Sequence, residues 1–328
     1  MNFLIAGAGA IGAYIGARMA QAGFDVTLFA RGPHLRAMQE NGVQVKSADG
    51  DGTFTARPRI VGSLEEVGPA DVIFLGVKAH ALPHLAPQLK PVLGPDTTVV
   101  STQNGIPWWY FQGFVGEWDG LRLERVDPGG VISAAIDSRR VVGSIVYFAT
   151  EVPSPGVIQY IEGNRISLGE PDGSRSDRVR RIAETLIASG LRCPVTTRIR
   201  HEIWVKVLGN TSFNPVSALT RSTLAQMVRD PGVSSVIRNI MQEVEAVSRK
   251  LGMELPVSIE QRIAGAEKVG EHKTSMLQDL EAGRPMELEA LVGAVVELGE
   301  RVGLPMTCTR TVYNCARLLA QSAVQSAK

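Results

Sequence analysis

One lysine and two asparagines in the second half of the chain have the spacing of a binding surface. Lys206, Asn210 and Asn214 recur at i, i+4 and i+8 among apolar residues, so a helix would place all three on one face. An ammonium and two amides are costly in a core without partners, whereas a cleft with a polar substrate supplies partners. A partly desolvated lysine has a lowered pKa and is a plausible proton donor near neutral pH. The alternative is a solvent-facing polar stripe, and the helix alone does not separate the two.

A glycine-rich turn near the N-terminus predicts a dinucleotide site. The apolar run 2–6 leads directly into the motif Gly7-Ala8-Gly9-Ala10-Ile11-Gly12, and a predicted helix continues to Gln21. In this arrangement the first glycine allows a tight turn, the second lets the backbone approach a pyrophosphate, and the third permits close packing of helix on sheet. The phosphates would then lie at the positive end of the helix.

The end of the second predicted strand favours NADP(H) over NAD(H). An NAD site usually has a carboxylate there for the ribose 2′-hydroxyl, but the run 25–30 ends at Arg31. A guanidinium suits a 2′-phosphate, and we expect His34 and Arg36 to add positive potential. The alternative is an ordinary strand-to-helix turn with a solvated arginine. The register of strand, glycines, helix and second strand argues against that reading.

Composition sets limits on the kind of protein. A chain of 328 residues predicts two domains, and 34 Lys+Arg against 33 Asp+Glu gives a net charge near +1, so we expect no nucleic-acid partner. The uncharged first 17 residues lack a basic start, and no later apolar run has the length of a membrane span, so we expect neither signal peptide nor membrane contact. The odd count of three cysteines without a CxxC motif favours reduced thiols in a cytoplasm, and Cys308 and Cys315 have a spacing that fits core packing.

The first half of the chain reads as alternating strands and helices, which predicts an α/β fold with an N-terminal Rossmann-type doubly wound sheet. A hairpin is expected from 43–46 and 54–56 around Asp49-Gly50-Asp51-Gly52. Two apolar strands, 71–77 and 98–101, end at Lys78 and just before Asn104. Because the carboxyl ends of parallel strands share one edge, both side chains are expected near the glycine motif.

Further along, the pattern changes from strands to helices. Val131–Ile136, Val141–Thr150 and Val157–Glu162 are predicted as antiparallel strands, and Ser174 or Ser176 as the cap of a helix that ends near Ala188. Long amphipathic stretches follow at 203–220, 233–251, 258–280, 286–302 and 306–325. We therefore predict an NADP-binding domain at 1–173 and an all-helical substrate domain at 174–328, with the active site between them.

Several motifs together resemble those of the ketopantoate reductase family. Besides the glycine motif with Arg31, they are Val77-Lys78-Ala79, Gln103-Asn104-Gly105, Trp204-Val205-Lys206 with Asn210 and Asn214-Pro215, and the segment 274–279 with Glu287. They are spread over the whole chain, so the joint match is far more specific than any one motif.

The resemblance implies a cytoplasmic enzyme that reduces 2-dehydropantoate to (R)-pantoate with NADPH in pantothenate biosynthesis. It implies that Lys206 gives a proton to the carbonyl oxygen as the hydride arrives. Substrate contacts by resemblance are Asn104, Asn210, Asn214 and Ser275, with Asn104 between substrate and cofactor. Cofactor contacts by resemblance are Arg31, Lys78, Asn104 and Glu287, with Ala135 in a segment of looser match. A positioned ammonium also suits the negative charge that builds on oxygen during the reaction.

Departures from the family pattern leave the substrate open. His272 stands where the family tends to have Asn, Val292 replaces another Asn, and an aromatic run, 108–111, follows Asn104-Gly105. These rings suit a bulkier 2-oxo acid or else belong to the core or a subunit contact. The alternatives are therefore a related reductase of another 2-oxo acid and a non-catalytic NADP(H) sensor. A homodimer is compatible with the sequence, and no metal is expected because Pro83 separates His80 from His84 and no third ligand is evident.

Overall fold

The computed structural model describes residues 1–47 and 52–326, and the chain forms two compact units. The first unit consists of Met1–Gln103, Trp109–Gly120 and Gly130–Ile199, and the second of Asn104–Trp108, Leu121–Gly129 and Arg200–Lys328. Each unit is therefore built from separate stretches of the chain. These units are defined by which parts of the chain pack together, whereas the predicted boundary at 173/174 marks the change from strands to helices. The boundary at 173/174 stays a prediction.

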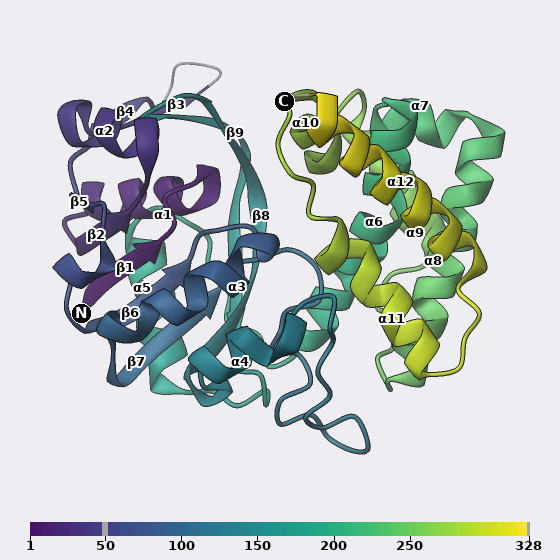
Figure 1. Cartoon of the computed structure of the whole chain (residues 1–328), viewed down its shortest axis with the longest axis horizontal. Helices are drawn as coiled ribbons and strands as arrows, with labels where there is room; N and C mark the ends of the chain where they lie inside the picture. Colours follow the sequence, from purple (N-terminus) through teal and green to yellow (C-terminus); the bar gives the residue numbers. More distant parts are fainter. Residues whose placement is uncertain (48–51, 327–328) are drawn as a thin grey trace. The chain divides into compact units, whose positions relative to one another are not determined.

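The first unit contains a mixed, mostly parallel sheet (Figure 1). Its order among the described residues is β4-β3-β9-β8-β7-β6-β1-β2-β5. β1 pairs in parallel with β2 and β6, and the parallel pairing continues through β7 to β8. The bounds are β1 Asn2–Ala6, β2 Asp25–Phe29, β3 Val43–Ser47, β4 Phe54–Ala56, β5 Arg59–Val61, β6 Ala70–Leu75, β7 Leu93–Ser101, β8 Val141–Ser154 and β9 Val157–Gly169.

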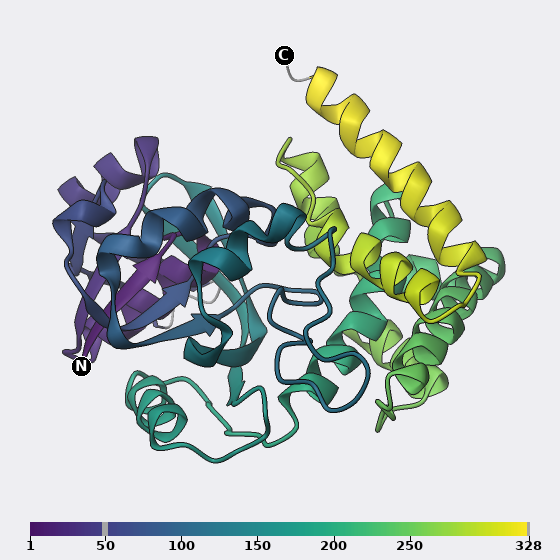
Figure 2. The same ribbon diagram turned by 60° about the horizontal axis from the view of Figure 1, so that its bottom comes forward.

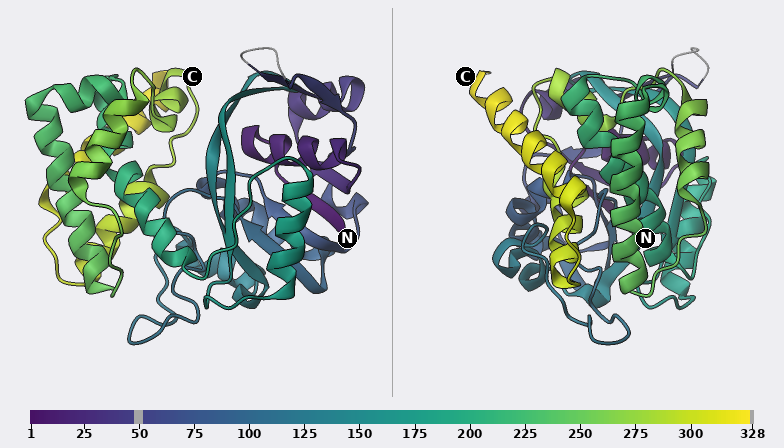
Figure 3. Two further views of the ribbon diagram at one scale, coloured as in Figure 1. Left: turned by 180° about the vertical axis from the view of Figure 1, so that it is seen from behind. Right: turned by 90° about the vertical axis from the view of Figure 1, so that its right-hand side faces the viewer.

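Helices cover both faces of this sheet. α1 (Ala10–Gln21) and α5 (Asp177–Ala188) lie on one face, and α3 (Leu82–Leu85), the 3₁₀ segment Ala86–Val92 and α4 (Val131–Ala135) lie on the other (Figures 1 and 3). α2 (Gly32–Asn41) connects β2 to β3. Ser176 caps α5 by accepting from the Val179 N–H, which selects one of the two predicted caps. The core beneath α1 and α5 includes Ile15, Leu28 and Ile182.

The predicted Rossmann-type sheet followed by a helical part is confirmed, but one predicted strand is wrong. Val131–Ile136 was expected in the sheet, whereas Val131–Ala135 is helix α4. Gly129 and Gly130, with φ of 63° and 74°, turn the chain left-handed just before Val131, and α4 packs on the Ala86–Val92 segment. Tertiary packing here outweighs the weak strand preference of the β-branched residues.

The hairpin predicted after the second strand is confirmed. β3 and β4 pair antiparallel, with Val43 opposite Ala56 and Val45 opposite Phe54. Most of the predicted turn, Asp49–Asp51, lies outside the described residues.

The second unit is helical. Its helices are α6 (Ile199–Thr220), α7 (Leu224–Arg229), α8 (Pro231–Lys250), α9 (Ile259–Val269), α10 (Ser275–Glu281), α11 (Ala294–Arg301) and α12 (Thr307–Ser326), with a π-helical turn at Glu289–Gly293. Its core includes Leu277, Leu291 and Tyr313. α12 leads to the C-terminal end of the chain (Figure 2), and Leu319, Ala320 and Ala323 of its second half pack against this core. None of the described helices is long and apolar enough to cross a membrane.

Two expectations in this unit are wrong. The stretch 258–280 is two helices, because α9 ends at Gly270, whose φ of 83° leaves the helical region, and α10 begins only after Thr274. The cysteine spacing was expected to fit core packing, yet Cys315 is exposed and Cys308 only partly buried.

The aromatic run after Asn104-Gly105 belongs to the core. Trp108, Trp109, Tyr110 and Phe111 are 5%, 1%, 0% and 1% exposed. Tyr110 and Phe111 meet edge to face with their ring centroids 4.8 Å apart. The rings therefore pack inside this chain, which removes the structural argument for a bulkier substrate.

Candidate functional site

The glycine turn has the geometry of a phosphate cradle. Gly7 has a φ of +109°, and a Cβ atom there would lie 2.3 Å from Cγ1 of Val77. A Cβ on Gly12 would lie 2.3 Å from the carbonyl oxygen of Gly7. Gly9 is exposed and precedes the first turn of α1, where the Ala13 N–H donates to the Gly9 oxygen. The turn thus leaves the amino end of α1 open to an anion.

A pocket of about 410 Å³ adjoins this turn at the carboxyl ends of β1 and β2. Arg31 lies at its rim, with the guanidinium 5.2 Å from the ring centroid of Phe29 and Nη2 donating to Oε1 of Gln88 over 3.3 Å. The pocket thus combines the amino end of a helix with a positive charge. Its lining is Gly7, Ala8, Gly9, Phe29, Ala30, Arg31, His34, Val77, Ala81, His84 and Leu85.

His34 lines this pocket as a neutral group. Its Nδ1 accepts a hydrogen bond from the Gly156 N–H over 2.9 Å, and burial lowers the pKa of the imidazole below its usual 6.5. His34 therefore does not add the positive charge expected from the sequence. The predicted contacts Lys78 and Ala135 are not among the described residues that line the pocket.

The ends of β6 and β7 are tied together by side chains of the loop that leads to Asn104. The Nε2 group of Gln103 donates to the carbonyls of Leu75 and Val77 over 2.6 and 2.8 Å. Thr102 Oγ1 donates to the same Leu75 carbonyl. Gln103, which sequence reasoning used only as part of a motif, therefore fixes the backbone on both sides of Gly76.

In the second unit, α6 carries the polar stripe that the sequence predicted. Lys206, Asn210 and Asn214 lie in one unbroken helix at i, i+4 and i+8. Asn214 is buried at 5% exposure, whereas Lys206 and Asn210 are partly exposed. The stripe therefore does not have the exposure of an ordinary surface face.

Lys206 has the electrostatics of a proton donor. Loss of hydration lowers the pKa of its ammonium to about 8 from 10.5, the carboxylate of Glu287 acts in the opposite direction, and the guanidinium of Arg262 lowers it further. At neutral pH the side chain carries its proton but releases it more readily than a solvated lysine.

A π-helical turn in the second unit contacts the segments that carry the predicted site residues. The turn Glu289–Gly293 follows Glu287, and its wider ladder leaves carbonyls to outside donors. Ala290 accepts from the Ile106 N–H over 3.1 Å, and Leu291 accepts from Thr211 Oγ1 of α6 over 2.7 Å. The segments that bear Asn104, Glu287 and Lys206 are therefore braced against one another.

Gly105 is required for this contact. It has a φ of +88°, and a Cβ atom there would lie 2.2 Å from the Ala290 oxygen. Any side chain would push the Asn104 segment off the π-turn.

Ser275 and its neighbour Thr274 begin α10. Thr274 caps the helix by accepting from the Leu277 N–H, and Ser275 is exposed. Glu289, the first residue of the π-turn, has a local partner, because the hydroxyl of Tyr313 donates to both of its carboxylate oxygens.

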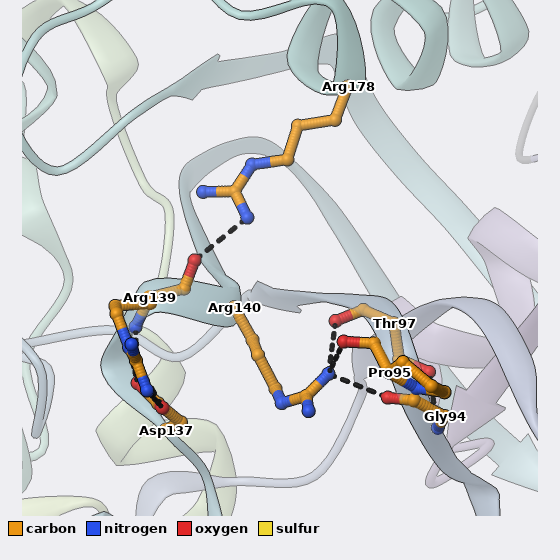
Figure 4. A network of polar contacts seen from close by, with 7 residues as sticks. All are labelled: Gly94, Pro95, Thr97, Asp137, Arg139, Arg140 and Arg178. Atoms are coloured by element: carbon orange, nitrogen blue, oxygen red, sulfur yellow. Dashed lines mark hydrogen bonds and ion pairs between the residues drawn. The ribbon is translucent and has the colours of Figure 1, made fainter.

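Another cavity of the first unit, about 750 Å³, lies at the opposite, amino ends of β6 and β7, and three of the arginines that line it hold other parts of the fold (Figure 4). Nη1 of Arg140 donates to the carbonyls of Gly94 and Pro95 over 2.7 and 2.9 Å. Arg178 pairs with Glu170, and Arg139 with Asp137. These charges already have partners, so we assign no ligand site there. Among residues 1–47 and 52–326 no group of three or more His, Cys, Asp or Glu is placed to hold a metal ion.

Comparisons with known proteins agree with this organisation. Residues 3–109 match the family model "Ketopantoate reductase PanE/ApbA", and residues 198–320 match the model of its C-terminal part. The chain is 50% identical over 322 residues to the 2-dehydropantoate 2-reductase of Mesorhizobium japonicum, covering 98% of each chain.

Solved structures share the whole fold. A crystal structure from Ralstonia solanacearum MolK2, assigned to ketopantoate reductase, has a TM-score of 0.93, 39% identity and 98% coverage of both chains. D-mandelate dehydrogenase in complex with NADH and anilino(oxo)acetate has a TM-score of 0.84 at 21% identity, with 98% and 99% coverage, and shares the fold.

Proposed function

The chain belongs to the ketopantoate reductase family, and from this premise we propose that it reduces 2-dehydropantoate to (R)-pantoate with NADPH. The oxidoreductase class rests on the curated relative at 50% identity. The substrate, the preference for NADPH and the residue roles are our inference from the site.

The first unit fits a nicotinamide dinucleotide. The packing around Gly7 and Gly12 leaves no room for a larger residue at either position. The amino end of α1 is open for a pyrophosphate. Arg31 at the rim of the pocket suits a 2′-phosphate. We assign the cofactor to the turn Gly7–Gly12 together with Arg31, Lys78, Asn104, Ala135 and Glu287. When bound, NADPH supplies the hydride for the reaction.

The chain's own chemistry is proton donation and orientation. Lys206 stabilises the negative charge on the carbonyl oxygen and gives that oxygen its proton. Asn210 and Asn214 hold the other oxygens of the substrate from the same helix face. Asn104 and Ser275 complete the proposed substrate contacts. The observation that carries this proposal is the placement of Lys206, Asn210 and Asn214 on one face of α6 that is partly or fully buried, and the lowered pKa of Lys206 supports it.

The test is loss of NADPH absorbance with 2-dehydropantoate, compared between wild type and Lys206→Ala. We expect the variant to lose turnover by at least about 100-fold, the scale of a general acid, with NADPH affinity retained. The same assay with NADH measures the cofactor preference assigned to Arg31. An unchanged turnover in Lys206→Ala would remove its catalytic role.

Two alternatives are decided by extending the assay to a panel of 2-oxo acids. Faster turnover of a larger acid would identify a related reductase with another substrate. Binding of NADPH without turnover of any acid would identify a sensor.

A further inference from the structure

Arg262 occupies a position on α9 where an apolar side chain is the rule. Ile259, Ile263 and Ala266 form the buried face of this helix, and Arg262 lies on the same face at i+3 from Ile259. Ser258 and Gln261 close a capping box at the start of α9, which fixes where that face points. A cation on a buried helix face is expensive, so its surroundings bear on function.

The guanidinium of Arg262 lies directly on the backbone of α6. A Cβ atom on Gly209 would fall 2.2 Å from Nη2, 2.7 Å from Nε and 2.8 Å from Cζ of Arg262. Glycine in a helix interior is destabilising relative to alanine. At Gly209 the guanidinium of Arg262 fills the space that a side chain would otherwise occupy.

Gly209 is adjacent to the catalytic stripe. It is three residues from Lys206 on the same helix, so a group that packs on Gly209 lies beside the Lys206 side chain. The charge of Arg262 lowers the pKa of Lys206, which places the two cations within electrostatic reach of each other. Like charges gathered in this way are stabilised by an anion between them.

A 2-oxo acid matches such a pair of cations. Its carbonyl oxygen and its carboxylate are on adjacent carbons, so the groups that bind them must also be neighbours. A guanidinium offers two parallel N–H donors to a carboxylate, whereas an ammonium is a point donor suited to one oxygen. Resting on the proposed function, we propose that Arg262, seated on Gly209, binds the carboxylate of the substrate and restricts the enzyme to 2-oxo acids.

The test compares Arg262→Gln and Arg262→Lys with wild type on a 2-oxo acid and on its methyl ester. We expect Arg262→Gln to lose about 10–100-fold in kcat/KM for the acid, mainly through KM, since charge-assisted hydrogen bonds are worth that much. The reaction with the ester and the affinity for NADPH should stay as in wild type. Arg262→Lys should recover part of the loss. Equal effects on acid and ester would show that Arg262 is structural and overturn the assignment.

Gly209→Ala tests the seat rather than the charge. The new methyl group displaces the guanidinium while both cations stay in the sequence, so KM for the acid should rise as in Arg262→Gln. Gly265→Ala in α9, where a Cβ meets no atom within 4 Å, is the matched control and should leave KM unchanged. A Gly209→Ala enzyme with wild-type KM would contradict the seat.

Two further measurements keep this inference separate from the proposed function. Calorimetric binding of 2-dehydropantoate in the presence of NADP⁺ requires no turnover, and Arg262→Gln should weaken it at least about 10-fold. In the unliganded protein, the same variant should shift the pH dependence of Lys206 acylation upward. If the acid binds through Arg262 but is not reduced, only the proposed function fails; if binding is unaffected by Arg262→Gln, only the Arg262 assignment fails.

Discussion

At the scale of single residues, the proposed function depends on the protonation states of a few side chains. Lys206 keeps its proton at neutral pH although loss of hydration and the charge of Arg262 lower its pKa to about 8, because the carboxylate of Glu287 acts in the opposite direction. His34 is the opposite case, since burial keeps it neutral beside the proposed cofactor pocket. Arg31 therefore supplies a permanent positive charge for the proposed 2′-phosphate in the lining of that pocket.

The pH dependence of reduction should follow Lys206. Only the protonated ammonium donates, so we expect the rate of 2-dehydropantoate reduction to fall as pH rises through about 8. Glu287→Gln removes the charge that raises the pKa and should move this limb to lower pH. Arg262→Gln removes the charge that lowers the pKa and should move it to higher pH.

The measurement is the pH profile of kcat for the three proteins at saturating NADPH and 2-oxo acid. Shifts of both variants in one direction would contradict the assignment of the limb to Lys206. A limb that neither substitution moves would do so as well.

At the scale of elements, the π-turn Glu289–Gly293 is the brace of the second unit. It uses carbonyls that a regular helix would keep for itself to hold both the Asn104 segment and α6. The brace has one steric requirement, the absence of a side chain at Gly105.

Gly105→Ala should therefore weaken both the fold and the site. The strained φ and the overlap with the Ala290 oxygen together should lower the free energy of unfolding by at least about 2 kcal/mol. KM should rise as Asn104 moves. Chemical denaturation and steady-state kinetics measure the two effects.

Gly113→Ala is the control for the backbone strain alone. Gly113 has a φ of +62° with no atom within 4 Å of a Cβ, so we expect a loss of only about 1 kcal/mol and normal kinetics. Equal losses in the two variants would show that the Ala290 contact carries no weight.

Much of this scale follows from sequence periodicity, and the exceptions have physical causes. The strands on either side of the glycine turn were predicted from continuous apolar runs, as is typical of strands buried on both faces, and the stripe on α6 from a period of 3.6 residues. α4 was not predicted, because its five residues include β-branched side chains and resemble a strand. The helix becomes apparent only from the two left-handed glycines that precede it in the structure. The π-turn and the packing of Arg262 on Gly209 could not be predicted, because both depend on contacts between segments that are distant in the sequence.

At the scale of the whole molecule, the helical unit is not one continuous piece of chain. It includes Asn104–Trp108 and Leu121–Gly129 from the first half of the sequence. The carboxylate of Glu297 in α11 accepts from the backbone N–H groups of Glu124 and Arg125, both over 3.0 Å. These early segments therefore complete the later helices.

A fragment of residues 200–328 alone should consequently be less stable than the same helices in the full chain. We expect a lower melting temperature by circular dichroism, because the partners of Ala290 and Glu297 are missing. A synthetic peptide of residues 104–129 should raise it in a concentration-dependent way. A peptide with no effect, or a fragment as stable as the full chain, would contradict this account.

The π-turn also has a consequence for how this protein can change in evolution. A π-turn has the form of an α-helix with one extra residue, and removing that residue would restore the regular ladder. It would also rotate everything on one side of the deletion by about 100° around the helix axis. Glu287, which immediately precedes this helix, would then lose its placement relative to Lys206. We therefore expect lineages that retain this activity to exchange residue types in Glu289–Gly293 but to keep its length.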